Sequence, residues 1–221
     1  MNDASNQLLN RRQEEKARRR DEILDAAEAA YAEMGWDKLK MDDVAKRARL
    51  SRALVYVYFK DKDDLHFAIV VRAFEALRQA FQTAIQGADN GYDRFSAIGH
   101  AYVSFAKQSP HYFVAFSRYE THQPDHIDCQ SNEMGCFKAS HLVHRLMCEV
   151  IEQGRQDGSI ALTHITADQL SILAWCFTHG FIQVAHTKRN LYGMYGISED
   201  NLLEAGFALF GAALKSTAAP P

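Results

Sequence analysis

The sequence predicts an all-α protein, because apolar residues recur at helical spacing along nearly the whole chain. Gly- and Pro-containing segments separate the periodic stretches, for example Gly87 to Gly91 and Ser109-Pro110. With 221 residues, 47% hydrophobic and 24% charged, the chain suits one large domain or a small domain joined to a larger one. We therefore expect helices packed around a sizeable core.

Two helical patterns come first along the chain, and the second of them is short. The first has Ile23, Ala27 and Tyr31 on one face and stops before Gly35, a residue that can end a helix. The second lies in "MDDVAKRA", where Val44 and Ala48 share a face and two aspartates occupy the first turn, which suits the helix dipole. Both segments are predicted to be helical.

The segment "SRALVYVYFKDKDDL", from Ser51 to Leu65, has the β-branched and aromatic composition of a strand. We predict a helix instead, because Ser51 is a good N-cap and an isolated strand among helices would leave its backbone hydrogen bonds unmade. In this helix Val55 and Phe59 face the core, one turn apart. Arg52, Tyr56 and Lys60 then lie along another side.

Helices are also expected over the rest of the chain. Thr166 and Gln169 form a capping box in sequence, which marks the start of the penultimate helix. The last two helices are apolar on more than one face, which indicates either a central core helix or a surface that packs against a second subunit. The expected ranges are 63–86, 92–108, 111–121, 134–153, 166–188 and 198–215.

Charge is distributed unevenly, although the formal net charge is only −3. The window from Asp37 to Lys62 holds eight Lys or Arg against four Asp. Residues 11–20 add six basic residues and two glutamates. Such a run is either a solvated start of a helix or an arm that reaches for phosphates.

Two short helices joined by a tight turn, with basic and phenolic groups on the free face of the second, predict a helix-turn-helix. The segment "GWDKLKMDDVAKRARLSRALVYVYFKDKDDL" resembles the DNA-binding domain of the tetracycline-repressor (TetR) family. Its matches to that family's pattern are Gly35, Val44, Ala45, Ala48, Ser51, Val55, Tyr56, Tyr58, Phe59, Lys62 and Leu65.

This resemblance implies a three-helix helix-turn-helix DNA-binding domain followed by a helical-bundle domain for ligand binding and dimerisation. We assign residues 1–17 to a basic arm, 18–66 to the DNA-binding domain and 67–221 to the ligand-binding and dimerisation domain. The implied function is a homodimeric regulator of transcription. We expect a repressor that a small-molecule effector releases from a palindromic operator in double-stranded DNA, although the same parts could activate.

Three residues depart from the family pattern. Lys40 replaces a capping Thr and cannot accept a hydrogen bond from the helix, but it can reach a phosphate. Arg49 replaces the Gly of the turn, so either a non-Gly residue adopts a left-handed conformation there or the turn differs in geometry. Leu54 stands where the family often has Thr. These departures prevent transfer of base preference from the family.

The expected DNA contacts follow from these positions. Arg52, together with Tyr56, is expected to reach a base edge, since Arg to guanine is the commonest specific contact. Tyr56 and Lys62 are expected to hold phosphates. The full set of predicted DNA-binding residues is Lys40, Arg49, Ser51, Arg52, Ala53, Leu54, Tyr56, Tyr58 and Lys62.

Two further sets are expected in the C-terminal part. Aromatic residues between helices suit a pocket for a mostly apolar ligand, although aromatic residues at helical spacing also fit a plain core. The predicted pocket residues are Tyr102, Phe105, Tyr112, Phe113, Phe116, Tyr119, Met147, Trp175 and His179. The predicted dimer interface, which the resemblance supports, contains Leu170, Phe177, Phe181, Leu202, Leu209 and Phe210.

A histidine and cysteine cluster offers an alternative. His122, His126, Cys129, Cys136, His141, His144 and Cys148 are all potential metal ligands. Their spacing matches no closed zinc pattern, and buried Cys and satisfied His are common, so we expect neither a metal nor a cofactor. The alternative is a metal- or thiol-responsive regulator, and a helical metalloenzyme is a weaker one. No catalytic constellation can be assembled from the sequence, so we expect no enzymatic activity.

The N-terminal residues lack an apolar segment for secretion, and no later stretch is long and apolar enough to span a membrane. The four cysteines, Cys129, Cys136, Cys148 and Cys176, have no CxxC spacing and are expected to be reduced. We therefore expect a cytoplasmic protein without membrane partners.

Overall fold

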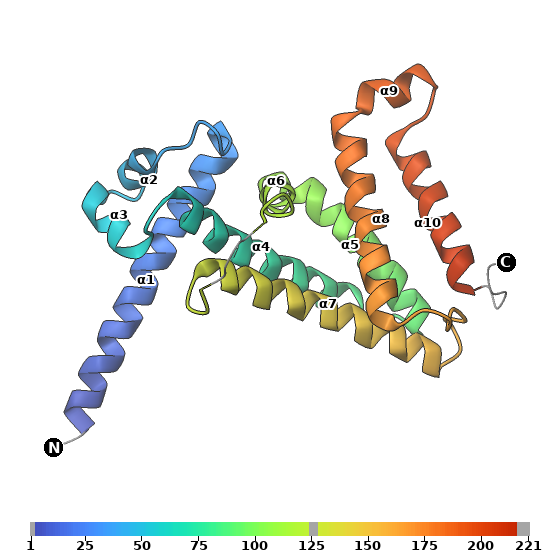
Figure 1. Ribbon diagram of the computed structural model, residues 1–221, viewed down its shortest axis with the longest axis horizontal. Coiled ribbons are helices and arrows are strands. Elements are labelled where there is room, and N and C mark those ends of the chain that lie inside the picture. Colours follow the sequence, from blue (N-terminus) through green and yellow to red (C-terminus); the bar gives the residue numbers. More distant parts are fainter. Residues whose placement is uncertain (1–2, 124–127, 216–221) are drawn as a thin grey trace. The chain divides into compact units, whose positions relative to one another are not determined.

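The computed structural model describes residues 3–123 and 128–215, which form helices and no strand (Figure 1). The predicted all-α class is confirmed. None of the helices in these ranges is long and apolar enough to cross a membrane. The helices are α1 (Asp3–Met34), α2 (Met41–Arg47), α3 (Arg52–Tyr58), α4 (Lys62–Ala84), α5 (Gly91–Gln108), α6 (Pro110–Tyr119), α7 (Asn132–Gln156), α8 (Ala167–Thr187), α9 (Arg189–Met194) and α10 (Glu199–Lys215).

The chain divides into two compact units. The N-terminal unit comprises Met1–Arg72 and Val114–Cys136, and the C-terminal unit comprises Ala73–Phe113 and Phe137–Pro221. The N-terminal unit thus includes a segment far along the sequence, beyond the stretch assigned to the DNA-binding domain. The functional boundaries at residues 17 and 66 stay a prediction.

The core of the N-terminal unit is built from the periodic residues of α1 to α4. Ile23, Val44, Val55 and Phe59 are completely buried. Arg72 of α4 reaches three acidic side chains of α1, with its Nη1 2.6 Å from Asp25 Oδ1, its Nη2 2.9 Å from Asp21 Oδ1 and Nη1 3.4 Å from Glu28 Oε1. Apolar packing and a multiple ion pair therefore hold α4 against α1.

In the C-terminal unit, α8 and α10 lie side by side (Figure 1). The rings of Phe177 and Phe210 have centroids 5.1 Å apart, and Phe210 also stacks on Phe95 of α5 at 6.0 Å. Gly206 allows this approach, because a Cβ there would lie 3.1 Å from the Phe177 ring. Phe177 and Phe210 thus pack within one chain.

Local signals predicted most helix ends. Thr166 Oγ1 accepts from Gln169 N at 3.1 Å and Gln169 Oε1 accepts from Thr166 N at 2.8 Å, which confirms the capping box. Asn90 Oδ1 caps α5 by accepting from Asp93 N at 2.9 Å.

The structure selects one of the two alternatives left open for residues 11–20: α1 begins at Asp3, so these residues belong to a continuous helix that runs to Met34. One expectation needs correction, because helix α9 lies in the expected connection between the last two long helices. Gly196, the second glycine of that connection, ends this helix. It has φ +67°, and Ile197 N donates to Tyr192 O at 3.0 Å. The Gly therefore marks a helix end rather than an extended loop.

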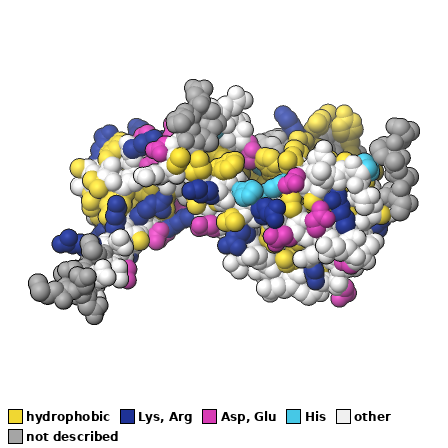
Figure 2. All heavy atoms as spheres, turned by 60° about the horizontal axis from the view of Figure 1, so that its bottom comes forward, with side chains coloured by type: hydrophobic (Ala, Val, Ile, Leu, Met, Phe, Trp, Pro, Cys, Tyr) yellow, Lys and Arg dark blue, Asp and Glu magenta, His cyan; other side chains and the backbone are white. Residues whose placement is uncertain are grey.

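Surface charge is mixed. On the face shown in Figure 2, Lys and Arg side chains lie among Asp and Glu side chains. This agrees with the small net charge of −3. Any site for a polyanion must therefore come from the local arrangement of cations.

Candidate functional site

The turn between α2 and α3 is closed by Arg49 in the left-handed conformation, with φ +57°. Arg49 N donates to Lys46 O at 3.1 Å and Leu50 N donates to Ala45 O at 2.9 Å, the two bonds of a Schellman motif. Of the two alternatives left open by the sequence, the turn accepts a non-Gly residue at this position. The exposed Arg49 side chain extends from the turn into solvent.

The helix α3 begins as predicted. Ser51 Oγ accepts from Leu54 N at 3.2 Å, and Ser51 has extended backbone angles. One side of α3 is buried through Val55. The opposite side is exposed through Arg52, Ala53, Tyr56, Val57 and the following Lys60.

Val57 is the residue of this surface that the sequence interpretation missed. Its side chain is 72% exposed, more than any other large apolar residue of α3. Helical spacing places Val57 one turn after Ala53, on the same exposed side of α3. This spacing could have predicted its exposure, but a β-branched residue in a strand-like segment suggests burial. An exposed β-branched side chain on this face can contact a thymine methyl group.

Arg52 is held in place from two sides. Its Nε lies 3.1 Å from Asp42 Oδ1 in the first turn of α2. Its guanidinium also lies over the Tyr56 ring at 5.5 Å, with Nη2 3.5 Å from Tyr56 Oη. The hydrogen bond to Tyr56 and the charge of Asp42 raise the pKa of Arg52. The two side chains expected to contact DNA together therefore already touch.

The other expected contacts differ in their surroundings. Lys40 is exposed at the start of α2, where Asp43 Oδ2 accepts from the Lys40 backbone N at 3.1 Å. Lys62 instead donates to the carbonyl of Trp36 and lies 4.8 Å over the Trp36 ring. Burial lowers the pKa of Lys62. Tyr58 and Leu54 are half-buried.

The basic residues of α1 fall into three groups. Arg18 and Arg19 pair with Glu15 and Glu22 along the helix, the shortest distances being 2.7 Å for Arg18 to Glu15 and 2.8 Å for Arg19 to Glu22. Arg20 donates to Asn132 Oδ1 at 2.7 Å. The remaining three, Arg11, Arg12 and Lys16, are exposed. These three are the side chains best suited to a phosphate backbone.

Three other predicted pocket residues lie around His179 in the C-terminal unit. Its Nδ1 lies 2.8 Å from Tyr102 Oη, its ring stacks on Phe113 at 4.8 Å, and Trp175 lies edge-on at 6.2 Å. Burial lowers the pKa of His179, so the ring is neutral near pH 7. We name His179, Tyr102, Phe113 and Trp175 the His179 cluster.

The other predicted pocket residues lie elsewhere. Phe105 stacks on Tyr112 at 6.1 Å, and Met147 is half-buried on α7. Phe116 and Tyr119 belong to the N-terminal unit, where Tyr119 lies edge-on to Phe67 at 6.3 Å. These two therefore belong to a different unit from the His179 cluster.

Exposure also separates the residues predicted for the dimer interface. Leu170 is 1% exposed and packs in the core of its own chain. Phe177, Phe181, Leu202 and Phe210 are half-buried, whereas Leu209 is 74% exposed. We call the following exposed residues the C-terminal apolar face: Leu173, Cys176 and Val184 on α8, and Ala205, Leu209 and Ala212 on α10.

The histidine and cysteine cluster is divided between the units. His122, Cys129 and Cys136 belong to the N-terminal unit, and His126 lies outside the described residues. Cys136 donates to Phe67 O at 3.1 Å, and burial raises the pKa of its thiol to about 12, so it is not a reactive thiolate. His141, His144 and Cys148 belong to the C-terminal unit.

Comparison with known proteins identifies a family match near the N-terminus and several relatives. Residues 23–69 match the family model of bacterial regulatory proteins of the tetR family. The transcriptional regulator HbdR of Aromatoleum sp. is 30% identical over 86 residues, which are 39% of this chain and 38% of HbdR. The transcriptional activator FasR of Mycolicibacterium smegmatis is 28% identical over 87 residues, which are 39% of this chain and 40% of FasR.

The chain thus spans about two fifths of the length of these curated relatives. Among solved structures, the regulator FadR of Bacillus subtilis in complex with stearoyl-CoA has a TM-score of 0.65 and 12% identity, covering 87% of this chain and 97% of FadR. This similarity shows a shared fold over most of the chain.

Proposed function

We propose that this chain is a sequence-specific DNA-binding regulator of transcription, because residues 23–69 match the family model of bacterial regulatory proteins of the tetR family. The observation that carries this proposal is the α2-turn-α3 unit. It buries Val55 and Phe59 and leaves Arg52, Tyr56 and Val57 exposed on the opposite side of α3. A short helix with such a free face fits a major groove.

The side chains of this surface suit two kinds of contact. Arg52 would donate to a guanine edge, while Ala53 and Val57 would pack on thymine methyl groups. Tyr56, Lys40 and Arg49 would bind phosphates on either side, which fixes the position of α3 on the duplex. Lys62 would contribute less to phosphate binding, because its ammonium already donates to the Trp36 carbonyl.

We propose that the regulator is a homodimer formed through the C-terminal apolar face. Support comes from Leu173 and Val184, which are 52% and 49% exposed on α8, and from Leu209, which is 74% exposed on α10. Exposed apolar side chains at helical spacing on two neighbouring helices suit the same surface of a second copy. Two-fold symmetry would then present two copies of α3 to a palindromic operator.

We propose the His179 cluster as the place where the effector binds. The cluster offers three aromatic rings and one polar pair, the His179 and Tyr102 side chains, which suits a mostly apolar molecule with one polar group. The solved FadR structure contains stearoyl-CoA, so acyl thioesters are the first ligands to test. Their apolar chains match the chemistry of the cluster.

The effector would act by binding one conformation of the dimer better than another. If the favoured conformation changes the spacing of the two α3 helices, they no longer match successive major grooves. This predicts a repressor that the effector releases. The relative FasR is an activator, so a transcription assay must determine whether this chain represses or activates.

Selection of bound sequences from a random DNA pool tests the proposal and yields the operator. The expected result is a palindromic site with half-sites about 10 base pairs apart, whose binding weakens as salt rises. A pool that shows no enrichment after repeated rounds would contradict sequence-specific binding.

The dimer is tested with Leu209→Glu. A charge at this position would be buried without a partner in the interface, so the variant should become a folded monomer that loses tight operator binding. Leu142→Glu is the matched control, because Leu142 is 54% exposed on α7, outside the C-terminal apolar face. Sedimentation and circular dichroism measure assembly and helix content, and a folded Leu209→Glu variant that stays dimeric would reject this interface.

A further inference from the structure

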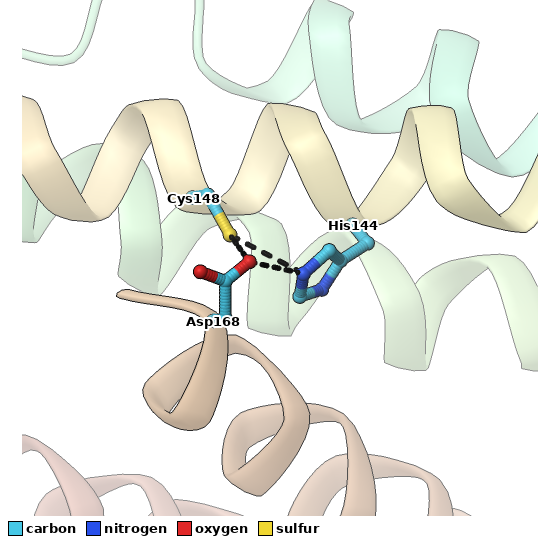
Figure 3. Close-up of side chains that lie close together, drawn as sticks. All are labelled: His144, Cys148 and Asp168. Carbon is cyan, nitrogen blue, oxygen red and sulfur yellow. Dashed lines mark hydrogen bonds and ion pairs between the residues drawn. The ribbon is translucent and has the colours of Figure 1, made fainter. Parts of the chain in front are cut away.

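Three side chains with different ligand atoms converge between α7 and α8 (Figure 3). His144 and Cys148 lie one turn apart on α7, and Asp168 lies in the first turn of α8. His144 Nε2 is 2.9 Å from Asp168 Oδ1 and 3.5 Å from Cys148 Sγ. Cys148 Sγ is 3.6 Å from the same Asp168 oxygen. The three atoms thus form a small triangle.

This arrangement differs from a catalytic relay. In a relay, the nucleophile and the carboxylate face opposite nitrogens of the imidazole. Here Cys148 Sγ and Asp168 Oδ1 both lie next to Nε2 of His144, while Nδ1 is 2.9 Å from Ser171 Oγ. The three groups are directed at a common point rather than arranged in a chain.

The dimensions of the triangle match those of a metal site. Zinc bonds of about 2.0 Å to oxygen, 2.05 Å to nitrogen and 2.3 Å to sulfur in a tetrahedral site place the ligand atoms about 3.3 to 3.6 Å apart. The two edges at sulfur, 3.5 and 3.6 Å, already have this length. Only the 2.9 Å edge between His144 and Asp168 has to open, by a few tenths of an ångström.

We propose that His144, Cys148 and Asp168 bind a divalent transition metal ion of the zinc class. A thiolate, an imidazole and a carboxylate are all zinc ligands, and the thiolate disfavours Mg²⁺ and Ca²⁺. When the metal binds, Cys148 loses its proton to solvent and the metal–sulfur bond forms. The Asp168 side chain is 67% exposed, so a water molecule can occupy the fourth position.

Ser171 has a positioning role in this site. Its hydroxyl is buried next to Nδ1 of His144, so it can accept a hydrogen bond from Nδ1–H and leave Nε2 free to bind the metal. Without metal, the same hydroxyl can donate to Nδ1 while Nε2–H donates to Asp168. A serine hydroxyl serves both arrangements because it is both donor and acceptor.

Metal binding by the purified 221-residue chain tests this proposal without DNA, so its outcome is independent of the proposed function. After chelator treatment, the chain is titrated with Zn²⁺ against a chromophoric competitor. It is also titrated with Co²⁺, whose thiolate charge-transfer absorption reports a sulfur ligand. We expect one ion per chain, a cobalt–thiolate band, and a higher melting temperature with metal than without it.

Variants distinguish this site from adventitious binding. Cys148→Ala should abolish the cobalt–thiolate band and weaken Zn²⁺ binding by about 100-fold or more. Asp168→Asn should also weaken Zn²⁺ binding, and the chain should stay folded because the Asp168 side chain is exposed. Ser171→Ala should reduce affinity about 10- to 100-fold, as expected for loss of a group that orients a ligand. Cys129→Ala and His141→Ala are matched controls, because both residues are exposed and lie outside the triangle.

Two results would overturn the proposal. One is a wild-type chain that binds neither Zn²⁺ nor Co²⁺ stoichiometrically. The other is a folded Cys148→Ala variant with the same metal affinity and the same cobalt spectrum as Cys129→Ala. Circular dichroism of the metal-free variants verifies that they are folded.

Discussion

The Arg52 guanidinium forms an ion pair with Asp42, with Nε and Oδ1 3.1 Å apart, and so connects the first turns of α3 and α2. This contact holds the Arg52 side chain at the exposed face of α3. Both side chains are substantially exposed, so the pair itself contributes little to stability. The ion pair instead orients the Arg52 guanidinium, which is expected to contact a base.

Arg52→Ala should relax base preference at one position in each half-site by about 1 to 3 kcal/mol. Tyr56→Phe is the comparison, since it keeps the ring and removes only the hydroxyl expected to bind a phosphate. That variant should lose about 1 kcal/mol on every sequence. Binding measured on a panel of single-base operator variants separates the two patterns. A uniform loss for Arg52→Ala would reassign Arg52 to the phosphate backbone.

Arg49→Gly should stabilise the protein by about 0.5 to 1 kcal/mol, because Gly adopts the left-handed conformation without the steric cost of a Cβ. The same change should weaken DNA binding if the exposed side chain binds a phosphate. Arg49→Ala removes the charge but keeps the conformational cost. Urea denaturation should therefore distinguish the two variants, while DNA titration should not. Equal unfolding midpoints would show that the turn imposes no cost on Arg49.

The exposed cations of α1 should act through the phosphate backbone. Replacing Arg11, Arg12 and Lys16 with Gln should reduce the slope of log affinity against log salt, by up to about 0.9 for each phosphate that is no longer neutralised. A control with Lys138, Arg145 and Lys188 replaced by Gln removes the same charge from the C-terminal unit. Equal slopes for the two triple variants would make this part of α1 a solvated extension.

His66 should make stability depend on pH. Its ring is 3% exposed, packs 4.8 Å from the Trp36 ring, and both nitrogens lack a hydrogen-bond partner within the described ranges. Burial is the main cause that lowers the pKa of His66 to about 4, against about 6.5 in the unfolded chain, and the positive charges of Arg118 and Lys62 act in the same direction. The unfolded chain therefore binds a proton more readily between these two values.

The free energy of unfolding should consequently lose the His66 contribution as the pH falls from about 6.5 to about 4, by roughly 3 kcal/mol in all. Above pH 6.5 this contribution is constant. His66→Phe should reduce the loss in this window, whereas His164→Gln, at an exposed position, should not. Urea unfolding at a series of pH values measures the difference. Parallel curves for wild type and His66→Phe would contradict the assignment.

Local chemistry in the sequence determined the helices and most of their ends. Ser51 caps α3 although the following residues favour a strand, because a cap bond and a buried face outweigh a weak propensity. Thr166 and Gln169 define the start of α8 in the same way. These signals act between residues three or four apart, so they are readable without a structure. The exposed face of α3 followed from the same periodicity.

Tertiary packing decided the features that depend on residues distant in sequence. Leu170 and Leu209 looked alike as apolar helix residues, but only Leu209 remains exposed once α8 and α10 have packed. Lys62 meets the Trp36 carbonyl, and Asp168 meets His144 and Cys148 from a different helix. Periodicity gives the face of a helix on which a residue lies, whereas the neighbour that covers this face depends on how whole helices pack.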